Sequence, residues 1–371
     1  MTIGSDDFLS LLREHDIRLA SGVPCSILEP IMTAIDLSPS IDYIPAANEG
    51  NALAIVAGAM LGGDNGVALM QDSGFGNVVN PLTSLCLTYG LSPFIVVGYH
   101  DPVSDEPQHR EMATLFPDIL RSLGLPLVEI GRDTTDVAAL GRDLDAARAS
   151  GRPVVIGIRR RAIAARGKPD AAGGDKGTRL ERDAAMAVLL SLLPPEAAVI
   201  VSTGHLSRSA HALGADRPAF YMVGSMGHAS SIALGLSRTG KAPERIVVVD
   251  GDGAMLMHLG ALSTIGAAAP ASLVHVVFDN GSYDSTGGQA STSATTDLAA
   301  VAMACGYRRA NTSLTRRGLA RAVEESLAIP GPHLLVVKTH PSPADELPSV
   351  MARHAPPAIA ARFAAQVRGA S

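Results

Sequence analysis

The chain has 371 residues, and 30 Lys and Arg against 36 Asp and Glu give it a net charge of −6. Its basic residues are scattered and only 4% of its residues are aromatic, which argues against a nucleic-acid surface. Every long apolar stretch is broken by Gly, Pro or charge, which argues against a membrane span.

The cysteines and the N-terminal residues indicate the cellular compartment in which we expect the protein. Cys25, Cys86 and Cys305 are far apart and have no metal-ligand spacing. This usage is typical of a reduced compartment. The opening stretch MTIGSDDFLSLL has two acids and no basic segment, unlike a secretory signal. We therefore expect a cytoplasmic location.

Short β-branched runs alternate with helical patterns along the chain. The first half has predicted strands at 16–21, 66–71, 93–98, 125–130 and 153–158, with a helix at 134–149. The second half has predicted strands at 198–203, 245–249, 273–278 and 333–338, with helices at 183–193 and 229–237. Continuous apolar strands separated by helices are typical of parallel sheets covered on both faces. The predicted fold class is α/β, with two doubly wound parallel-sheet domains.

A polar segment separates the two halves. RGKPDAAGGDKGTRLER, residues 166–182, is rich in Gly and charge and has no apolar period. It is typical of an inter-domain linker. We expect a first domain at 1–168, a linker at 169–182 and a second domain at 183–371. Their similar plans leave a distant duplication open.

The strongest chemical signal is a pair of turns in 245–289. One apolar strand leads into DGDG, residues 250–253, and another leads into DNGS, residues 279–282. In a parallel sheet both turns lie at the carboxyl edge, where glycines let backbone N–H groups approach an anion. Oxygen atoms of Asp252 and Asn280 suit Mg²⁺ bound together with phosphate. The alternatives are an ordinary Asp/Gly turn and a calcium loop, although the acid that ends a calcium loop is absent.

A single acid, Glu49, precedes the apolar run in NEGNALAIVAGAML, residues 48–61. Burying a carboxylate is costly unless a partner holds it. Taken alone, Glu49 is best interpreted as a helix cap, which contributes at most ~1 kcal/mol. Together with the GDG and Asn-Gly turns, a catalytic carboxyl group is favoured.

These turns resemble the diphosphate and Mg²⁺ motif of thiamine-diphosphate enzymes. The resemblance extends over nearly the whole chain, to the short two-domain decarboxylases of 3-phosphonopyruvate and 3-sulfopyruvate. It is carried by GVPCSILEP (22–30), NEGNALAIVAGAML (48–61), QDSGFGNVVNPLTSL (71–85), DEPQH (105–109) and VGSMGHASSIALG (223–235). It implies a pyrimidine-binding first domain and a diphosphate-binding second domain, with no middle domain.

In the second half, the resemblance implies a cofactor and metal site. The metal ligands would be Asp252, Asn280 and the carbonyl of Ser282. Met226 would be the wedge that bends thiamine diphosphate, and Gly224 would grip the pyrimidine edge. The backbone around the diphosphate would come from Thr203, Gly204, Gly251, Gly253 and Ala254.

In the first half, the resemblance gives roles to Glu49 and His109. Glu49 would hydrogen-bond N1′ of the aminopyrimidine, and His109 would be an acid/base group or an anion contact. An isolated His in a polar loop is otherwise simply solvated. The loop 71–85 would lie against the substrate at a subunit interface, or it is a plain turn whose Gly74 and Gly76 need positive φ.

Substrate contacts are expected from six residues, and three cationic residues are candidates for balancing its charge. The six are Cys25, Ser26, Gln71, Ser73, Ser285 and Thr286, and the three are Arg110, Arg208 and His228.

Three residues depart from the family pattern. Asp279 stands where the first Asn of an Asn-Asn pair is expected, but Asn280 keeps the ligand. Asp72 stands where Asn is expected. Cys25 stands where phosphonopyruvate decarboxylases commonly have Asp and sulfopyruvate decarboxylases often have Cys. Its alternative role is that of a small packed residue.

The implied activity is a thiamine-diphosphate- and Mg²⁺-dependent carboxy-lyase. The first choice is 3-phosphonopyruvate to phosphonoacetaldehyde and CO₂, in phosphonate biosynthesis, and the alternative is sulfopyruvate to sulfoacetaldehyde. The two halves of each site would come from different subunits, so at least a homodimer is expected. A nucleotide-binding dehydrogenase would need GxGxxG, which neither half has after its first strand. A non-catalytic oligomeric α/β binding protein would need neither Glu49 nor the paired turns.

Overall fold

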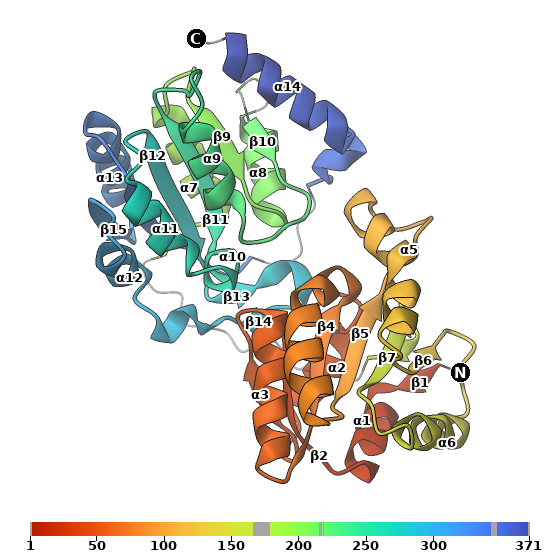
Figure 1. Cartoon of the computed structure of the whole chain (residues 1–371). Helices are drawn as coiled ribbons and strands as arrows, with labels where there is room; N and C mark the ends of the chain where they lie inside the picture. Colours follow the sequence, from red (N-terminus) through yellow and green to blue (C-terminus); the bar gives the residue numbers. More distant parts are fainter. Residues whose placement is uncertain (1, 166–178, 215–216, 218, 343–346, 370–371) are drawn as a thin grey trace. The chain divides into compact units, whose positions relative to one another are not determined.

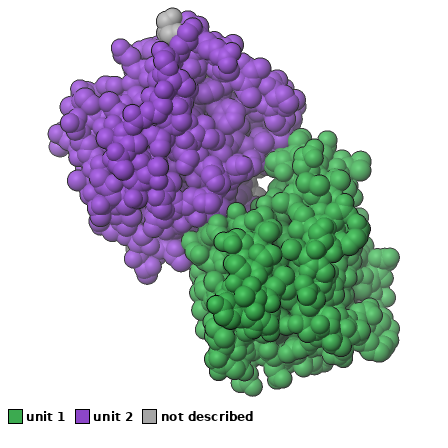
Figure 2. Space-filling view, viewed as in Figure 1, with its two compact units in different colours: residues 1–172 green, residues 173–371 purple. Residues whose placement is uncertain are grey.

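The computed structural model describes residues 2–165, 179–214, 217, 219–342 and 347–369. The chain divides into two compact units, Met1–Ala172 and Gly173–Ser371, coloured separately in Figure 2. Residues 169–178 of the predicted linker lie outside the described residues, and the first helix of unit 2 begins at Arg182. The domain ranges 1–168 and 183–371 remain predictions. No described helix is both long and apolar enough to cross a bilayer.

Unit 1 alternates strands and helices from its start (Figure 1). Its elements are β1 (Ile3–Gly4), α1 (Ser5–Glu14), β2 (Ile17–Gly22), α2 (Glu29–Asp36), β3 (Asp42–Pro45), α3 (Glu49–Leu61), β4 (Asn65–Gln71), η1 (Asp72–Val78), α4 (Val79–Pro81), η2 (Leu82–Leu87), β5 (Phe94–Tyr99), α5 (Pro107–Ser122), β6 (Leu127–Ile130), α6 (Val137–Arg148), β7 (Val154–Arg159) and β8 (Ile163–Ala164).

Unit 2 follows a similar alternation. Its elements are α7 (Arg182–Leu192), β9 (Ala198–Val201), α8 (His205–Leu213), β10 (Ala219–Tyr221), α9 (Ala229–Ser237), β11 (Ile246–Gly251), α10 (Asp252–Met257), α11 (Ala261–Ala268), β12 (Leu273–Asp279), β13 (Ser282–Tyr283), η3 (Asp284–Thr286), β14 (Gln289–Ala290), η4 (Thr292–Thr295), α12 (Leu298–Ala304), β15 (Arg309–Ser313), α13 (Arg316–Ala328), β16 (His333–Lys338), η5 (Val350–Ala352) and α14 (Pro356–Gly369).

The two main sheets have the same topology. Unit 1 orders its six strands β3-β2-β4-β5-β7-β6, and unit 2 orders its six β10-β9-β11-β12-β16-β15. All the pairings in both sheets are parallel. Counted within its own sheet, each order is 2-1-3-4-6-5. The first and third strands of each sheet are neighbours, and strands are added in opposite directions on either side of this pair. Ligands bind at the carboxyl ends of strands at such a switch point.

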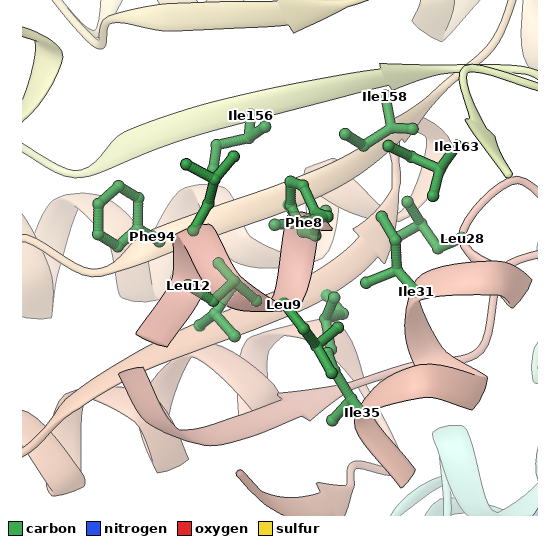
Figure 3. Packing of buried hydrophobic residues seen from close by; sticks show 14 of the residues in the cluster. Phe8, Leu9, Leu12, Leu28, Ile31, Ile35, Phe94, Ile156, Ile158 and Ile163 are labelled. Atoms are coloured by element: carbon green, nitrogen blue, oxygen red, sulfur yellow. The ribbon is translucent and has the colours of Figure 1, made fainter. Parts of the chain in front are cut away.

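Each sheet is buried on both faces because its central strands are apolar at successive positions. In β4, Val67 and Leu69 belong to the cluster that packs under α1, α2 and α6, whereas Ala68 and Met70 belong to the cluster under α3 and α5. Figure 3 shows the first cluster, in which side chains of α1 and α2 meet Phe94 of β5 and side chains of β7. Unit 2 has two corresponding clusters. The predicted doubly wound α/β class is confirmed.

The nine predicted strands all occur, with small shifts at their ends. Of the strands in the two six-stranded sheets, β3, β10 and β15 were not predicted, and each lies at a sheet edge. Edge strands need less apolar sequence because they are covered less completely, and β3 and β15 are indeed only partly buried. The shared strand order supports the duplication that the sequence left open.

Candidate active site

In both units, the predicted site residues follow the carboxyl ends of the first four strands of the sheet. In unit 1, Cys25 follows β2, Glu49 follows β3, Ser73 follows β4 and His109 follows β5. In unit 2, Thr203 follows β9 and Asp252 directly follows β11. Met226 and Asn280 follow β10 and β12. Each unit therefore gathers its own set of polar groups at one sheet edge. This is the consequence of residues in turns after parallel strands, which converge in space although they are far apart in the chain.

Glu49 is the first residue of α3 and is only 2% exposed. The helix is capped by its neighbour, because the Asn48 side chain accepts a hydrogen bond from the Gly50 N–H at 2.8 Å. The Glu49 Oε2 atom instead accepts from the side-chain amide of Asn77 at 2.7 Å. The alternative role of Glu49 as the cap is therefore taken by Asn48, which leaves the carboxyl group for another task.

Gly74 leaves the space that the Glu49 carboxyl group occupies. A Cβ atom at Gly74 would lie 2.2 Å from Glu49 Oε1, far inside contact distance. The expectation that Gly74 and Gly76 need positive φ is wrong, since neither appears among the positive-φ glycines. Gly74 is needed for close approach rather than for backbone conformation. At Gly76 the nearest atom to an added Cβ is Met112 Cε at 3.6 Å, an ordinary contact.

Burial raises the pKa of the Glu49 carboxyl group, and the Asn77 hydrogen bond opposes the rise only in part. A carboxyl group with a raised pKa exchanges its proton more readily near neutral pH than an exposed one does. Its environment therefore favours proton sharing with a partner nitrogen over a fixed negative charge.

The other polar cluster of unit 1 is built from Asp72, His100 and His109. Asp72 is fully buried and lies 2.6 Å from the His100 ring, from its Oδ1 to Nδ1. The His100 ring stacks on His109 of α5, with centroids 3.8 Å apart and planes 3° apart. Burial, and then the neighbouring His100, lower the pKa of His109 to about 4. His109 is thus a packed, neutral imidazole at pH 7 rather than a solvated one.

The four predicted substrate residues of unit 1 fall in different environments. Ser26 is exposed and Gln71 is half-buried at the end of β4. The Ser73 hydroxyl is buried without a hydrogen-bond partner among the described residues, so it is available to a ligand. Cys25 is 1% exposed in the apolar core, and burial raises its thiol pKa to about 11. This surrounding favours the packed alternative for Cys25.

In unit 2, the three predicted metal ligands lie after neighbouring strands, because β11 pairs with β12. Asp252 is 3% exposed and accepts a hydrogen bond from the Ser291 hydroxyl. Asn280 Oδ1 accepts a hydrogen bond from the Ser282 N–H at 3.0 Å, and the Ser282 carbonyl takes no part in that hydrogen bond. Asn280 Nδ2 donates to Asp284 at 2.7 Å. These hard oxygen donors fit a divalent cation such as Mg²⁺.

The charge balance at this edge also fits a cation. Burial raises the pKa of Asp252 to about 6, and the nearby charge of Asp279 adds to the rise. Asp279, the departure from Asn, is matched by an ion pair with Lys338 and by a hydrogen bond from Ser293 at 2.7 Å. None of the described groups that affect the pKa of Asp252 is a cation. A bound metal would therefore supply the missing positive charge.

Glycines bring the cofactor motifs of unit 2 together. Gly227, with φ of 83°, packs so closely that an added Cβ would lie 2.8 Å from the Ala254 carbonyl oxygen. An added Cβ at Gly253 would lie 2.4 Å from the Tyr283 ring, and one at Gly204 would lie 3.6 Å from the Ser285 hydroxyl. The turns after β9, β10, β11 and β12 therefore form one continuous surface.

The remaining predicted residues of unit 2 lie on or beside this surface. Met226 is half-buried between Ser225 and Gly227, which have φ of 52° and 83°. A positive φ at Ser225 is an uncommon conformation for a residue with a side chain, and such positions cluster at ligand sites. The Thr203 hydroxyl donates to the Val223 carbonyl at 3.3 Å. Gly224, Gly251 and Thr286 are half-buried.

The three cationic candidates make contacts of their own. Arg110 is exposed and donates to the Asp105 carbonyl at 2.9 Å. Arg208 donates to the Leu347 carbonyl at 3.2 Å, and His228 is exposed.

Several residues that contact the predicted site could not be predicted from the sequence. Asn77 lies within the motif at 71–85 but has no role in the family pattern, and His100 is marked only by its place after a strand. Ser291 and Lys338 meet their carboxylates only through the fold.

The chain matches two protein-family models, each in a different half. Residues 2–120 match "Thiamine pyrophosphate enzyme, N-terminal TPP binding domain", and residues 202–337 match "Thiamine pyrophosphate enzyme, C-terminal TPP binding domain". A protein named phosphonopyruvate decarboxylase from Streptomyces viridochromogenes is 37% identical, with 98% of this chain and 95% of that protein covered. This chain belongs to the thiamine pyrophosphate enzymes.

Two further relatives of this thiamine pyrophosphate enzyme bear on its place in the family. A phosphonopyruvate decarboxylase from Streptomyces hygroscopicus is 37% identical, covering 91% of this chain and 88% of that protein. A sulfopyruvate decarboxylase from Methanosarcina acetivorans is 27% identical, covering 86% and 87%. The predicted membership of the phosphonopyruvate and sulfopyruvate decarboxylase group is confirmed, and the two matched domains support thiamine diphosphate as the cofactor.

Proposed function

We propose that this enzyme decarboxylates 3-phosphonopyruvate to phosphonoacetaldehyde and CO₂, using thiamine diphosphate and Mg²⁺. The observation that carries the proposal is Glu49, a buried carboxyl group held by Asn77 in a space that only glycine at position 74 leaves open. Burying such a group without a cationic partner is costly. A ring nitrogen that shares its proton would offset that cost.

The chain's own groups divide the work by unit. In unit 1, Glu49 would hold a proton at the aminopyrimidine ring nitrogen. In unit 2, Asp252, Asn280 and the Ser282 carbonyl would hold Mg²⁺, and the backbone of residues 251–254 would face the diphosphate. Thiamine diphosphate, when bound, supplies the electron sink for the loss of CO₂ from a 2-oxo acid.

His109 would complete the reaction as a proton-transfer group. Its Nδ1 atom is buried and has no hydrogen-bond partner within the described part of the chain. Its lowered pKa keeps the imidazole neutral at pH 7, so the ring offers a proton acceptor and no positive charge with which to pair an anion.

The substrate choice rests on the relatives. The two phosphonopyruvate decarboxylases are each 37% identical to this chain, and the sulfopyruvate decarboxylase is 27% identical. Sulfopyruvate, with a headgroup of similar shape, is the second candidate. Measuring CO₂ release from phosphonopyruvate, sulfopyruvate and pyruvate side by side tests the choice. A higher kcat/KM for phosphonopyruvate is expected, and release only from sulfopyruvate would overturn it.

We also propose that the enzyme self-associates. The Glu49 group lies in unit 1 and the metal ligands lie in unit 2, yet both would act on one cofactor. In the family that the motifs resemble, the two come from different subunits. At least a dimer would then be needed to complete a site.

A further inference from the structure

Asp72, His100 and His109 form a close cluster, and the proposed function accounts for only one of its three residues. One ligand-type atom from each residue lies within 4.8 Å of the others. Asp72 starts η1, His100 follows β5, and His109 lies in the first turn of α5, so three separate segments build the cluster. Only His109 has a role so far.

Asp72 accepts hydrogen bonds on both of its oxygens. Oδ1 accepts from the Ser73 backbone N–H at 2.7 Å, and Oδ2 accepts from the His100 backbone N–H at 2.9 Å. An asparagine in this place would point its NH₂ group at one of these two N–H donors. The two backbone donors therefore favour a carboxylate over an amide at position 72.

The cluster is poorly shaped for a metal ion. An imidazole binds a metal through a lone pair in its ring plane, but the two rings are stacked with planes 3° apart. Parallel planes do not converge on one ion. Asp72 Oδ1, the oxygen that contacts the His100 ring, also accepts from the Ser73 N–H, so both of its lone pairs are used. The arrangement fits a shared proton better than a shared metal.

The geometry places that proton on His100. A carboxylate is an acceptor only, so the His100 Nδ1 atom, 2.6 Å from Asp72 Oδ1, must carry the hydrogen. This hydrogen bond fixes the tautomer and the orientation of the His100 ring, on which the His109 ring stacks at 3.8 Å.

The other charged groups around His109 are Asp105 and Arg160, which form an ion pair at 2.6 Å and largely offset each other. Arg159 donates to the His100 carbonyl at 3.1 Å and forms an ion pair with Glu129. None of these replaces the partner that Asp72 gives to His100.

We propose that Asp72 is a positioning residue that holds the His100 ring through its Nδ1–H in the stack against His109, and thereby fixes the His109 ring in place as the uncharged proton-transfer group. The proposal rests on the proposed function for the role of His109, but the arrangement of the two rings can be tested without it. Burial and the neighbouring His100 both lower the pKa of His109, in agreement with this arrangement.

The experiment follows the His109 ring by NMR in the full-length protein with ¹³C-labelled histidine, and His109→Gln identifies its signal. In the wild type we expect a midpoint at a pH of about 4. In His100→Phe, which keeps an aromatic ring for stacking and leaves Asp72 on its backbone donors, the midpoint should rise because the lowering effect of His100 is lost. It should stay below about 6.5, the value of a free histidine, because burial is the larger cause and remains. In Asp72→Asn, the loosened stack should expose His109 and raise the midpoint by a smaller amount, because Asp72 itself raises the pKa of His109.

Asp118→Asn is the matched control, since Asp118 is on the same helix as His109 but its side chain is 66% exposed and forms an ion pair with Arg121. It should leave the midpoint unchanged. If Asp72→Asn does not fold, His100→Phe decides the question. Unchanged midpoints in the folded variants, or a stoichiometric metal that is lost in His109→Gln, would overturn the proposal.

A second measurement separates this proposal from the proposed function. In the active enzyme, the acid limb of the kcat/KM profile should move up in both variants by the same amount as the NMR midpoint, because the limb would follow the His109 titration. A purely structural role would lower activity evenly at all pH values. If the wild type released no CO₂ from either oxo acid while the NMR midpoints still moved, the proposed function would fail and the arrangement of the two rings would stand.

Discussion

A Cβ atom on Gly74 would lie 2.2 Å from the carboxyl oxygen Oε1 of Glu49. Two segments that follow different strands, β3 and β4, thus meet with no space for a single added carbon. The Asn77 amide, from the same segment as Gly74, donates to the other oxygen of Glu49. The position of this carboxyl group is therefore set from both sides.

Gly74→Ala tests that relationship directly. The added methyl should displace Glu49 and lower turnover by about 100-fold, the range expected for loss of an acid–base group. Overpacking should lower the free energy of unfolding by about 1–3 kcal/mol. Gly76→Ala is the control, because its Cβ makes only an ordinary contact with Met112 at 3.6 Å. Steady-state kinetics and urea unfolding measure both effects, and equal turnover in the two variants would contradict the assignment.

Glu49→Gln should separate activity from stability. The amide keeps an acceptor for Asn77 but cannot share a proton, so turnover should fall by about 10²–10⁴-fold. The cofactor-free protein should become more stable by on the order of 1 kcal/mol at pH 7, because a buried carboxyl group is replaced by a neutral one. Thermal unfolding without cofactor measures the gain. Turnover near the wild-type level would remove Glu49 from the mechanism.

Asp252→Ala should weaken the binding of Mg²⁺ with thiamine diphosphate. The buried carboxylate is the charged member of the proposed ligand set, so its loss should abolish most of the rise in melting temperature that the cofactor and metal give the wild type. Asp297→Asn is the control, since Asp297 is an exposed helix cap in the same unit and Asn caps equally well. An unchanged rise in the Asp252 variant would reject the metal site.

Mixing two inactive variants tests self-association. Glu49→Gln and Asp252→Ala each damage one half of the proposed site. If each site combines halves from two subunits of a dimer, refolding an equal mixture should restore about a quarter of wild-type activity, because half of the dimers carry one intact site. Separate refolding of each variant is the control. No recovery in a mixture shown to contain hybrid dimers would place both halves of the site in one subunit.

The pH dependence of stability should carry the signature of His109. Its pKa is about 4 in the folded protein, and about 6.5 in the unfolded chain. Between these values the unfolded chain binds more protons, so the free energy of unfolding rises with pH and is lost as the pH falls from 6.5 toward 4. In His109→Gln this slope should be shallower, by on the order of 1–2 kcal/mol over the window. Denaturant unfolding at several pH values measures it, and parallel curves would contradict the lowered pKa.

The central strands and the two-domain plan could be predicted from the sequence because a strand buried on both faces must be apolar at every position. β11 and β12 are such strands, and the turns that follow them carried the cofactor motif. Edge strands such as β15 lack that continuous pattern and were missed. Glu49 and Asp252 could also be selected from the sequence, since each is an acid next to an apolar run.

What only the tertiary structure decided is how these acids are held. Asn77 and Gly74 surround Glu49 because η1 returns beside the start of α3, and His100 reaches Asp72 because β4 and β5 are neighbours in the sheet. The sequence pattern marks which residues are buried, because burial depends on local apolar periodicity. It does not mark which polar groups meet, because hydrogen-bond partners are set by the packing of segments that are distant in the chain.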